Sequence, residues 1–238
     1  MPRFYVDAAL RAGSSVLLPE DSAHHAVHVL RVHAGDEITL FNGRGGEYAG
    51  RIASIQRLKV LVDVLAHQAV ERESPLRMVL VQGVSAGERM DFTVRKSVEL
   101  GVAEIQPVLA ASSVARPKGE RAAARHAHWQ KVAVAACEQC GRNQIPKVQP
   151  MIAAAAYRGG EGKKILLSPR SELRFSQAAK GGEVFTIAAG PEAGFNADEE
   201  RAFLDAGFVP ARLGPRVLRT ETAGLAALAA LSALAGDF

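Results

Sequence analysis

The sequence has few of the features that mark secreted, membrane-embedded or disulfide-stabilised proteins. Its 238 residues include only two cysteines, too few for a disulfide framework, and aromatic residues make up 5% of the chain. Residues 1–7 lack the basic and then apolar pattern of a signal peptide. The longest apolar run, residues 223–235, is shorter than the ~20 residues that span a bilayer. We expect a cytoplasmic protein with a mainly aliphatic core and no membrane association.

Several common catalytic motifs are absent as well. No G-x-G-x-x-G follows a predicted strand, and Gly162-Lys163-Lys164 lacks the upstream glycine and the Ser/Thr of a phosphate-binding loop. Neither G-x-S-x-G nor H-E-x-x-H occurs. These absences argue against hydride transfer with a dinucleotide, nucleotide hydrolysis, and serine-esterase or zinc-protease activity.

Two small groups of potential metal ligands are present. His24 and His28 share one face of a predicted helix, but they do not extend into a recognised zinc spacing. Cys137 and Cys140 form a C-x-x-C at the end of a predicted helix, whereas redox pairs lie at helix starts, where the dipole lowers a thiol pKa. We expect no metal site and two structural thiols; a metal or redox protein is the alternative.

The positive charge of the chain is concentrated in its middle. The net charge is +4; residues 1–70 and 151–238 are each neutral, and residues 71–150 hold twelve basic and eight acidic residues. Around Glu120, basic residues predominate, which predicts contacts with the phosphates of a nucleic acid. A solvated helix face is the alternative. The candidate phosphate contacts are Arg116, Lys118, Arg121 and Arg125.

Residues 1–70 have the pattern of a small β module. Runs rich in Val, Ile, Leu and Tyr predict strands over 3–6, 15–18, 38–41, 47–55 and 60–65. Asn42-Gly43 is a strong turn signal, and one helix is predicted over 23–30, capped by Asp21 or Ser22. The charged stretch 71–75, which ends in proline, is a predicted linker. The pattern favours a small barrel with one helix.

From Leu76 onward, predicted strands alternate with helices, which is typical of a largely parallel α/β sheet. Strands are predicted over 77–81, 105–109, 165–167, 184–189 and 211–213, and helices over 89–100 and 120–140. Asn196 is the predicted cap of a further helix, and Thr220 or Thr222 that of the last. Leucines at 225, 228, 231 and 234 wrap about half of that helix, so we expect it to be deeply buried or packed on two sides, one of them against another subunit.

Two Gly-Pro turns stand where apolar strands end and helices are about to begin. The first is residues 190–195 and the second is residues 213–223. Open α/β sheets bind ligands in the loops at one edge of the sheet. The second turn also carries Arg216, Arg219 and Glu221, charges that a simple connection would not need. We therefore expect the two turns to meet at one ligand site.

The chain resembles the RsmE family, bacterial 16S rRNA uridine-N3 methyltransferases of the SPOUT (trefoil-knot) superfamily. The matching segments are 72–76, 87–92, 96–102, 129–132, 136–146, 190–195 and 213–222. Residues 1–70 resemble the family's PUA-like RNA-binding barrel, including residues 28–32 and Gly35-Asp36. The resemblance implies a PUA-like β-barrel over 1–70, a linker over 71–75 and a SPOUT α/β trefoil-knot domain with a mostly parallel sheet over 76–238.

The resemblance also implies a cofactor, partners and site residues. It implies S-adenosylmethionine as cofactor, 16S rRNA of the small ribosomal subunit as substrate, and a homodimer. The implied cofactor-binding residues come from three loops and are Leu167, Ser168, Pro169, Ala189, Gly190, Pro191, Glu192, Gly194, Leu213, Gly214, Val217, Leu218, Thr222 and Ala223. The family usually has glycine at the position of Ala193, and alanine would cost about 1 kcal/mol there if φ is positive.

Methylation at uridine N3 removes a proton that lies between two carbonyl groups. Cationic groups near O2 and O4 would stabilise the resulting anion, and Arg219 is the first candidate, followed by Arg216 and Arg142. Glu221 or Glu192 is a candidate proton acceptor, although either could instead hold an arginine or cap a helix.

Other functions are compatible with the same residues. They are a knot methyltransferase that acts on tRNA or on a ribose 2′-OH, and a non-catalytic assembly factor that binds rRNA. The neutral N-terminal module could bind RNA through a local patch formed by Arg31, Arg44 and Arg51.

Overall fold

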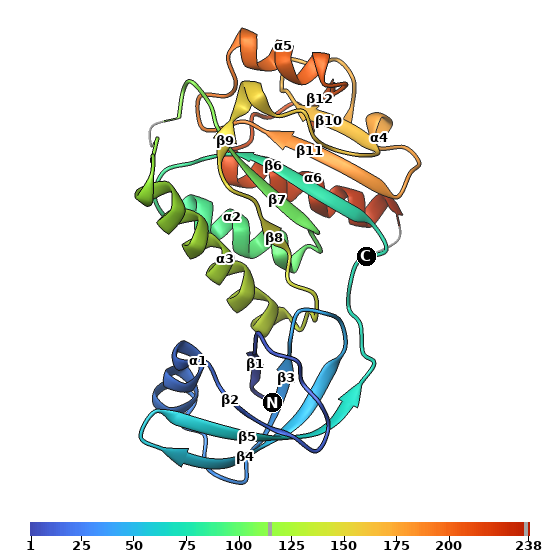
Figure 1. Ribbon diagram of the computed structural model, residues 1–238. Coiled ribbons are helices and arrows are strands. Elements are labelled where there is room, and N and C mark those ends of the chain that lie inside the picture. Colours follow the sequence, from blue (N-terminus) through green and yellow to red (C-terminus); the bar gives the residue numbers. More distant parts are fainter. Residues whose placement is uncertain (114–115, 236–237) are drawn as a thin grey trace. The chain divides into compact units, whose positions relative to one another are not determined.

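The chain forms two compact units in the computed structural model, which describes residues 1–113, 116–235 and 238 (Figure 1). The first unit combines Met1–Glu73 with Cys137–Ile145, and the second combines Ser74–Ala136 with Pro146–Phe238. The boundary expected at residues 71–75 is therefore one of several places where the chain passes from one unit to the other.

The first unit is built on a five-stranded sheet in the order β1-β3-β4-β5-β2. Its strands are β1 (Arg3–Tyr5), β2 (Ser15–Leu17), β3 (Glu37–Phe41), β4 (Glu47–Gln56) and β5 (Lys59–Gln68). The strands β3, β4 and β5 form an antiparallel meander, whereas β1 pairs with β3 in parallel. The predicted Asn42-Gly43 turn lies between β3 and β4, where Gly43 has a positive φ of 77°. Aliphatic side chains such as Ile38, Leu40 and Val62 form a fully buried core.

The helix of the first unit differs from the one predicted over residues 23–30. α1 (Glu20–His24) begins directly after Pro19, so the prediction of Asp21 or Ser22 as the cap was wrong, and a π-helical turn (His25–Val29) follows it. Proline has the φ of a helix start built in, which brings the acidic Glu20 and Asp21 into the first turn, near the positive end of the helix dipole.

Residues 137–145 pack with the first unit. Arg3 donates through Nη2 to Asn143 Oδ1 at 2.7 Å and to the Gly141 carbonyl at 3.2 Å. The carboxylate of Glu138 accepts the backbone amide of Tyr5 at 2.9 Å. These contacts join segments more than 130 residues apart in the chain, which is why spacing alone assigned residues 137–145 to the C-terminal domain.

Residues 71–73, which were expected to be linker, are also held by the first unit. The amide of Gly46 donates to the Glu71 carboxylate, and Arg72 donates to Glu47 Oε2 at 3.0 Å. The start of the predicted linker is therefore an ordered part of this unit.

The second unit is an α/β domain with a seven-stranded sheet, and its principal strands run in the order β12-β10-β11-β6-β7-β8. Its strands are β6 (Arg77–Gly83), β7 (Glu104–Leu109), β8 (Lys147–Val148), β9 (Ile152–Ala153), β10 (Lys163–Leu167), β11 (Val184–Ala189) and β12 (Val209–Ala211). Each of these pairings is parallel, as predicted. β12 starts two residues before the predicted strand and includes Pro210, whose missing N–H is tolerated because β12 is an edge strand.

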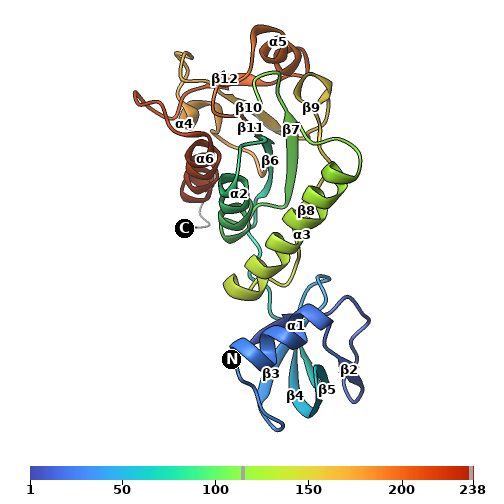
Figure 2. The same ribbon diagram turned by 90° about the vertical axis from the view of Figure 1, so that its left-hand side faces the viewer.

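Helices cover both faces of this sheet (Figures 1 and 2). They are α2 (Glu88–Glu99), α3 (Glu120–Cys140), η2 (Ala154–Ala156), α4 (Phe175–Ala178), α5 (Ala197–Asp205) and α6 (Thr220–Ala235). α6 lies beside α2 and packs against β6 and β11, so Leu228 and Leu231 are buried, whereas Leu234 is 56% exposed. Within the described residues, none of the helices combines the length and the apolar character that a membrane crossing requires.

The predicted cap of α5 is confirmed. Asn196 Oδ1 accepts the Glu199 amide and Glu199 Oε2 accepts the Asn196 amide, both at 2.9 Å, which forms a capping box. The other oxygen of Glu199 accepts the amide of Ala111 at 2.6 Å, so this cap also holds the loop after β7.

Candidate active site

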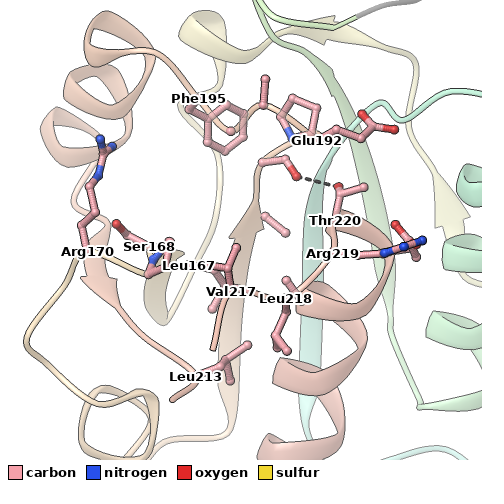
Figure 3. A pocket seen from close by; sticks show the side chains of 18 of the residues that line it. Leu167, Ser168, Arg170, Glu192, Phe195, Leu213, Val217, Leu218, Arg219 and Thr220 are labelled. Carbon is pink, nitrogen blue, oxygen red and sulfur yellow. Dashed lines mark hydrogen bonds between the residues drawn. The ribbon is translucent and has the colours of Figure 1, made fainter. Parts of the chain in front are cut away.

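Three loops meet at one edge of the seven-stranded sheet (Figure 3). They follow β10, β11 and β12, which are neighbours in the sheet and end at the same edge because they are parallel. The pocket between them has a volume of about 600 Å³, within the ~300–1,000 Å³ typical of small-molecule sites. Every residue that lines it belongs to the second unit.

The structure brings most of the predicted cofactor-binding residues together around this pocket. Those that line it are Leu167, Ser168, Pro169, Ala189, Gly190, Pro191, Glu192, Gly194, Leu213, Gly214, Val217, Leu218 and Ala223. Thr222 is not among them; its side chain is exposed on the first turn of α6. Of the predicted catalytic residues, Arg216, Arg219 and Glu221 line the pocket and Arg142 does not.

Apolar side chains form one wall of the pocket. Leu167 comes from the end of β10, and Leu213, Val217 and Leu218 come from the loop before α6 (Figure 3). Val217 is 80% exposed, an unusual position for an aliphatic side chain. This wall can bury the flat faces of a planar ring.

The first turn of α6 is tied to the loop after β11. Thr220, predicted as a possible cap, is instead the first residue of the helix, and its hydroxyl donates to the Gly190 carbonyl at 2.7 Å (Figure 3). The prediction of Thr220 as the cap was wrong because its hydroxyl bonds to a neighbouring loop. Thr222 lies inside the helix and does not precede it either.

Ion pairs hold two of the acidic residues at the rim of the pocket. Glu192 accepts from Arg89 Nη1 at 2.9 Å and from the Ala86 amide at 3.3 Å, and Glu200 accepts from Arg170 at 2.6 Å. Burial alone would raise the pKa of Glu192, but hydrogen bonds from its own amide, from Ala86 and from Arg89 outweigh it and keep the pKa below the ordinary value. Arg216, Arg219 and Glu221 have no ion pair within the described part of the chain.

Arg142 lies in the first unit, where it is only 5% exposed. Its guanidinium donates through Nε to Glu73 at 3.0 Å and makes a second bond to the same oxygen through Nη2. Arg142 and Glu73 both belong to the first unit, so this pair holds residues 137–145 to the end of its first segment. The candidate role of Arg142 in stabilising the uracil anion stays a prediction.

Ala193 does not need the conformation of a glycine. The positive φ in this loop belongs to Gly194, at 73°, and Ala193 is not among the non-glycine residues with positive φ. The strain considered for alanine at this position is therefore absent.

The cysteines and histidines do not assemble a metal site. Burial raises the pKa of the Cys137 thiol to about 12, and its Sγ lies 3.6 Å from the Gln144 carbonyl. The rings of His24 and His28 contact each other, with centroids 4.6 Å apart. Among the residues that the structure describes, three or more His, Cys, Asp or Glu side chains nowhere come together as metal ligands.

The predicted RNA contacts are exposed side chains. In the first unit these are Arg31, Arg44 and Arg51, of which Arg51 pairs with Glu37 at 3.4 Å. In the second unit, Arg116, Arg121 and Arg125 line a groove of about 400 Å³, and Lys118 is exposed nearby in the chain.

Sequence reasoning missed several residues that line the pocket. They are Arg89, Arg170, Ala193, Phe195, Glu200, Ala211 and Thr220. Arg89 and Glu200 are the residues of α2 and α5 that line the pocket, so helical periodicity carried no signal for them. Phe195 and Thr220 belong to the two Gly-Pro turns, and their position there was the available signal.

Comparison with known proteins places this chain in a family. The family model described as "RNA methyltransferase domain" matches residues 72–232, and that described as "RNA methyltransferase PUA domain" matches residues 18–65. A Buchnera aphidicola protein named "Ribosomal RNA small subunit methyltransferase E" is 34% identical, over 100% of this chain and 95% of the relative. A Bacillus subtilis protein of the same name is 27% identical, over 98% and 96%.

Two solved structures share both units of the fold. The Neisseria gonorrhoeae ribosomal RNA small subunit methyltransferase E bound to S-adenosyl methionine has a TM-score of 0.92 and 40% identity, over 98% of both chains. A putative methyltransferase from Legionella pneumophila with bound cofactor SAM has a TM-score of 0.93 and 35% identity, over 97% of this chain and 96% of that chain. The predicted SPOUT-type α/β fold and PUA-like module are thereby confirmed, and the chain belongs to the ribosomal RNA small subunit methyltransferase E family.

Proposed function

We propose that this protein transfers a methyl group from S-adenosylmethionine to N3 of a uridine in 16S rRNA, as a cytoplasmic homodimer. Its family makes it an S-adenosylmethionine-dependent rRNA methyltransferase. The observation that carries the proposal is the pocket in which Arg216, Arg219 and Glu221 stand beside the two Gly-Pro loops.

The residues of the pocket fit the cofactor. When bound, S-adenosylmethionine supplies a methyl group on a positively charged sulfur. Leu167, Leu213 and Leu218 offer an apolar wall for a nucleobase. A Cβ atom at Gly190 would lie 3.1 Å from Gly194 Cα, so the turn is tight and has little room for a side chain at this position. A ligand in the pocket can therefore approach the backbone of the turn closely. Carboxylates and guanidinium groups on the rim match the charges of an amino-acid end.

The charged residues of the α6 loop fit the chemistry of uracil N3. Loss of the N3 proton leaves negative charge on O2 and O4, and Arg216 and Arg219 place positive charge at the rim where a base would enter. Glu221 is the assigned proton acceptor, because Glu192 is already held by Arg89 and Ala86.

Exposed basic residues fit an RNA substrate. The groove of Arg116, Arg121 and Arg125 presents guanidinium groups that match backbone phosphates. We assign the exposed Arg31, Arg44 and Arg51 of the PUA-like unit to the same role.

A homodimer is supported by apolar side chains left at the surface. Val217 is 80% exposed and Leu234 is 56% exposed, although both belong to the segment around α6. Such side chains are typical of a surface that a second copy covers. Sedimentation equilibrium would show twice the monomer mass, and a monomer at micromolar concentration would contradict this part of the proposal.

A methyl-transfer assay with purified ribosomal subunits and RNAs tests the reaction. The protein is incubated with labelled S-adenosylmethionine and with small ribosomal subunits, free 16S rRNA or tRNA, and the modified nucleoside is identified by mass spectrometry. We expect 3-methyluridine in 16S rRNA. Label in tRNA or on a ribose 2′-OH would refute the assignment, and rRNA binding without cofactor binding would indicate an assembly factor.

Substitution of Arg219 tests the assigned site. Arg219→Ala is expected to lower kcat by about 10²–10³, the effect of removing one stabilising donor in other enzymes. The matched control is Arg201→Ala, an exposed arginine on α5 outside the pocket, which should leave kcat unchanged. Equal rates for both variants would remove Arg219 from the mechanism.

A further inference from the structure

The end of β6 lies behind the pocket and does not line it. Gln82 and Gly83 are its last two residues, and both are buried. Both Gly-Pro loops rest on this dipeptide, one through a hydrogen bond and one through backbone packing. Resting on the function proposed above, we infer that Gln82 is a positioning residue that holds the two cofactor-binding loops in register through Thr220.

A buried chain of hydrogen bonds links the two loops. Gln82 Nε2 donates to Thr220 Oγ1 at 3.1 Å, and Thr220 Oγ1 donates to the Gly190 carbonyl at 2.7 Å. The same amide nitrogen donates to the Gly83 carbonyl at 3.1 Å, which fixes its orientation. Gln82 is fully buried, so these bonds lie away from bulk solvent, where a hydrogen bond is electrostatically stronger, and the Thr220 hydroxyl points toward the Gly190 carbonyl.

Gly83 supports the same arrangement by the absence of a side chain. A Cβ at this position would lie 2.4 Å from Pro191 N and 2.5 Å from Pro191 Cδ. The first Gly-Pro turn therefore packs directly on the backbone of β6, next to the residue that holds the second turn. α2, the helix that follows β6, also contacts the first Gly-Pro turn, because Arg89 Nη1 donates to Glu192 at 2.9 Å.

The chain contains a matched control for Gln82. Gln106 is a buried glutamine on the neighbouring strand β7, and its amide also donates to the carbonyl of the next residue, Pro107, at 2.9 Å. Its second acceptor is the Pro150 carbonyl at 2.8 Å, outside the pocket. Gln106→Leu thus removes the same group and about the same number of bonds, without touching the cofactor loops.

Calorimetric titration of the 238-residue protein with S-adenosylmethionine tests the inference. We expect Gln82→Leu and Thr220→Val each to weaken binding about tenfold, the size of one buried hydrogen bond, and the double variant to weaken it no more than either alone. Thr220→Ser keeps the hydroxyl and should therefore bind S-adenosylmethionine with most of the affinity of the unsubstituted protein. Gln106→Leu should lower the thermal midpoint as Gln82→Leu does and leave the affinity within about twofold, since its bonds lie outside the pocket.

Three outcomes would overturn the inference. They are unchanged affinity in Gln82→Leu, an equal loss of affinity in Gln106→Leu, and additive losses in the double variant. Failure of the unsubstituted protein to bind S-adenosylmethionine would instead refute the proposed function itself, so the two results are distinguishable.

Discussion

At the scale of single residues, the hydrogen bonds of the pocket show which of its acidic side chains are already paired with an arginine. Glu192 and Glu200 each hold an arginine, Arg89 and Arg170, and so serve the shape of the rim. Both pairs are partly exposed and contribute little to overall stability. Glu221 lines the same pocket and takes part in neither pair. Each of the two ion pairs joins a loop of the pocket to a helix, which the local sequence does not reveal.

The raised pKa of Cys137 predicts that its thiol reacts slowly in the folded protein. A pKa of about 12 leaves roughly one thiol in ten thousand ionised at pH 8, and the thiolate is the reactive form. We expect iodoacetamide to modify the half-buried Cys140 first in the native protein, and Cys137 only after unfolding, as measured by peptide mass spectrometry. Cys140→Ser should keep methyl transfer. Rapid modification of native Cys137, or loss of activity in Cys140→Ser, would revive the redox alternative.

At the scale of elements, helix starts depend on contacts beyond the local sequence. Asn196 was recognisable as a cap because its partner Glu199 is three residues away. Thr220 was misassigned because its partner Gly190 is thirty residues away. α1 is a different case, because its cap is Pro19, a local residue that stands two positions before the first expected cap. A cap with a local side-chain partner, such as Asn196, can therefore be predicted, whereas a hydroxyl with a distant partner, such as that of Thr220, cannot.

The cap of α5 can be tested by substitution. Asn196→Ala should lower the free energy of unfolding by about 1 kcal/mol, because the Glu199 amide loses its acceptor. Asn196→Ser should recover most of this loss, since serine is a comparable cap. Urea denaturation measures both values. Equal stability of the alanine variant and the unsubstituted protein would mean that the cap contributes nothing.

The start of α3 and the segment before it can be tested as an RNA contact. Arg121→Glu with Arg125→Glu should weaken rRNA binding, and each lost phosphate contact should reduce the slope of log affinity against log salt by about 0.7–0.9. Lys180→Glu with Arg201→Glu changes the same charge at exposed sites outside the groove and is the control. An identical slope in both double variants would assign the basic residues to a solvated face.

At the scale of the whole molecule, a partly buried network of charges ties segments of the first unit together. Glu47 accepts from Arg3 at 2.5 Å and from Arg72 at 3.0 Å, which joins β1, β4 and the segment after β5. Burial alone would raise the pKa of Glu47, but the hydrogen bonds from Arg72 and Arg3 outweigh it and keep the pKa below the ordinary value. The network thus stabilises the fold while Glu47 is ionised.

This network predicts how stability depends on pH. Because the folded pKa of Glu47 lies below the unfolded value of about 4.5, its contribution is present above pH 4.5 and is lost as the pH falls through the folded pKa. Glu47→Gln should cost about 1–3 kcal/mol of unfolding free energy at pH 7 and less at pH 3. The exposed Glu37, paired with Arg51, is the control, and Glu37→Gln should cost little at either pH. A loss in Glu47→Gln that does not depend on pH would exclude this account.

The sequence by itself was enough for the fold class and for most of the pocket. Alternating apolar strands and glycine-stopped helices predict the parallel sheet, because strand and helix periodicities depend only on neighbouring residues. The two Gly-Pro turns predict the ligand loops for the same reason, because glycine allows a positive φ and proline fixes its own φ, and both effects are local.

Only the tertiary structure decided which distant residues meet. It joined residues 137–145, with Arg142, to the first unit, and it placed Gln82 beneath Thr220 and Arg89 beside Glu192. Such contacts depend on the order of strands in the sheet and on which side chains face each other across it. That order is set by the packing of the whole core, so no local pattern carries it.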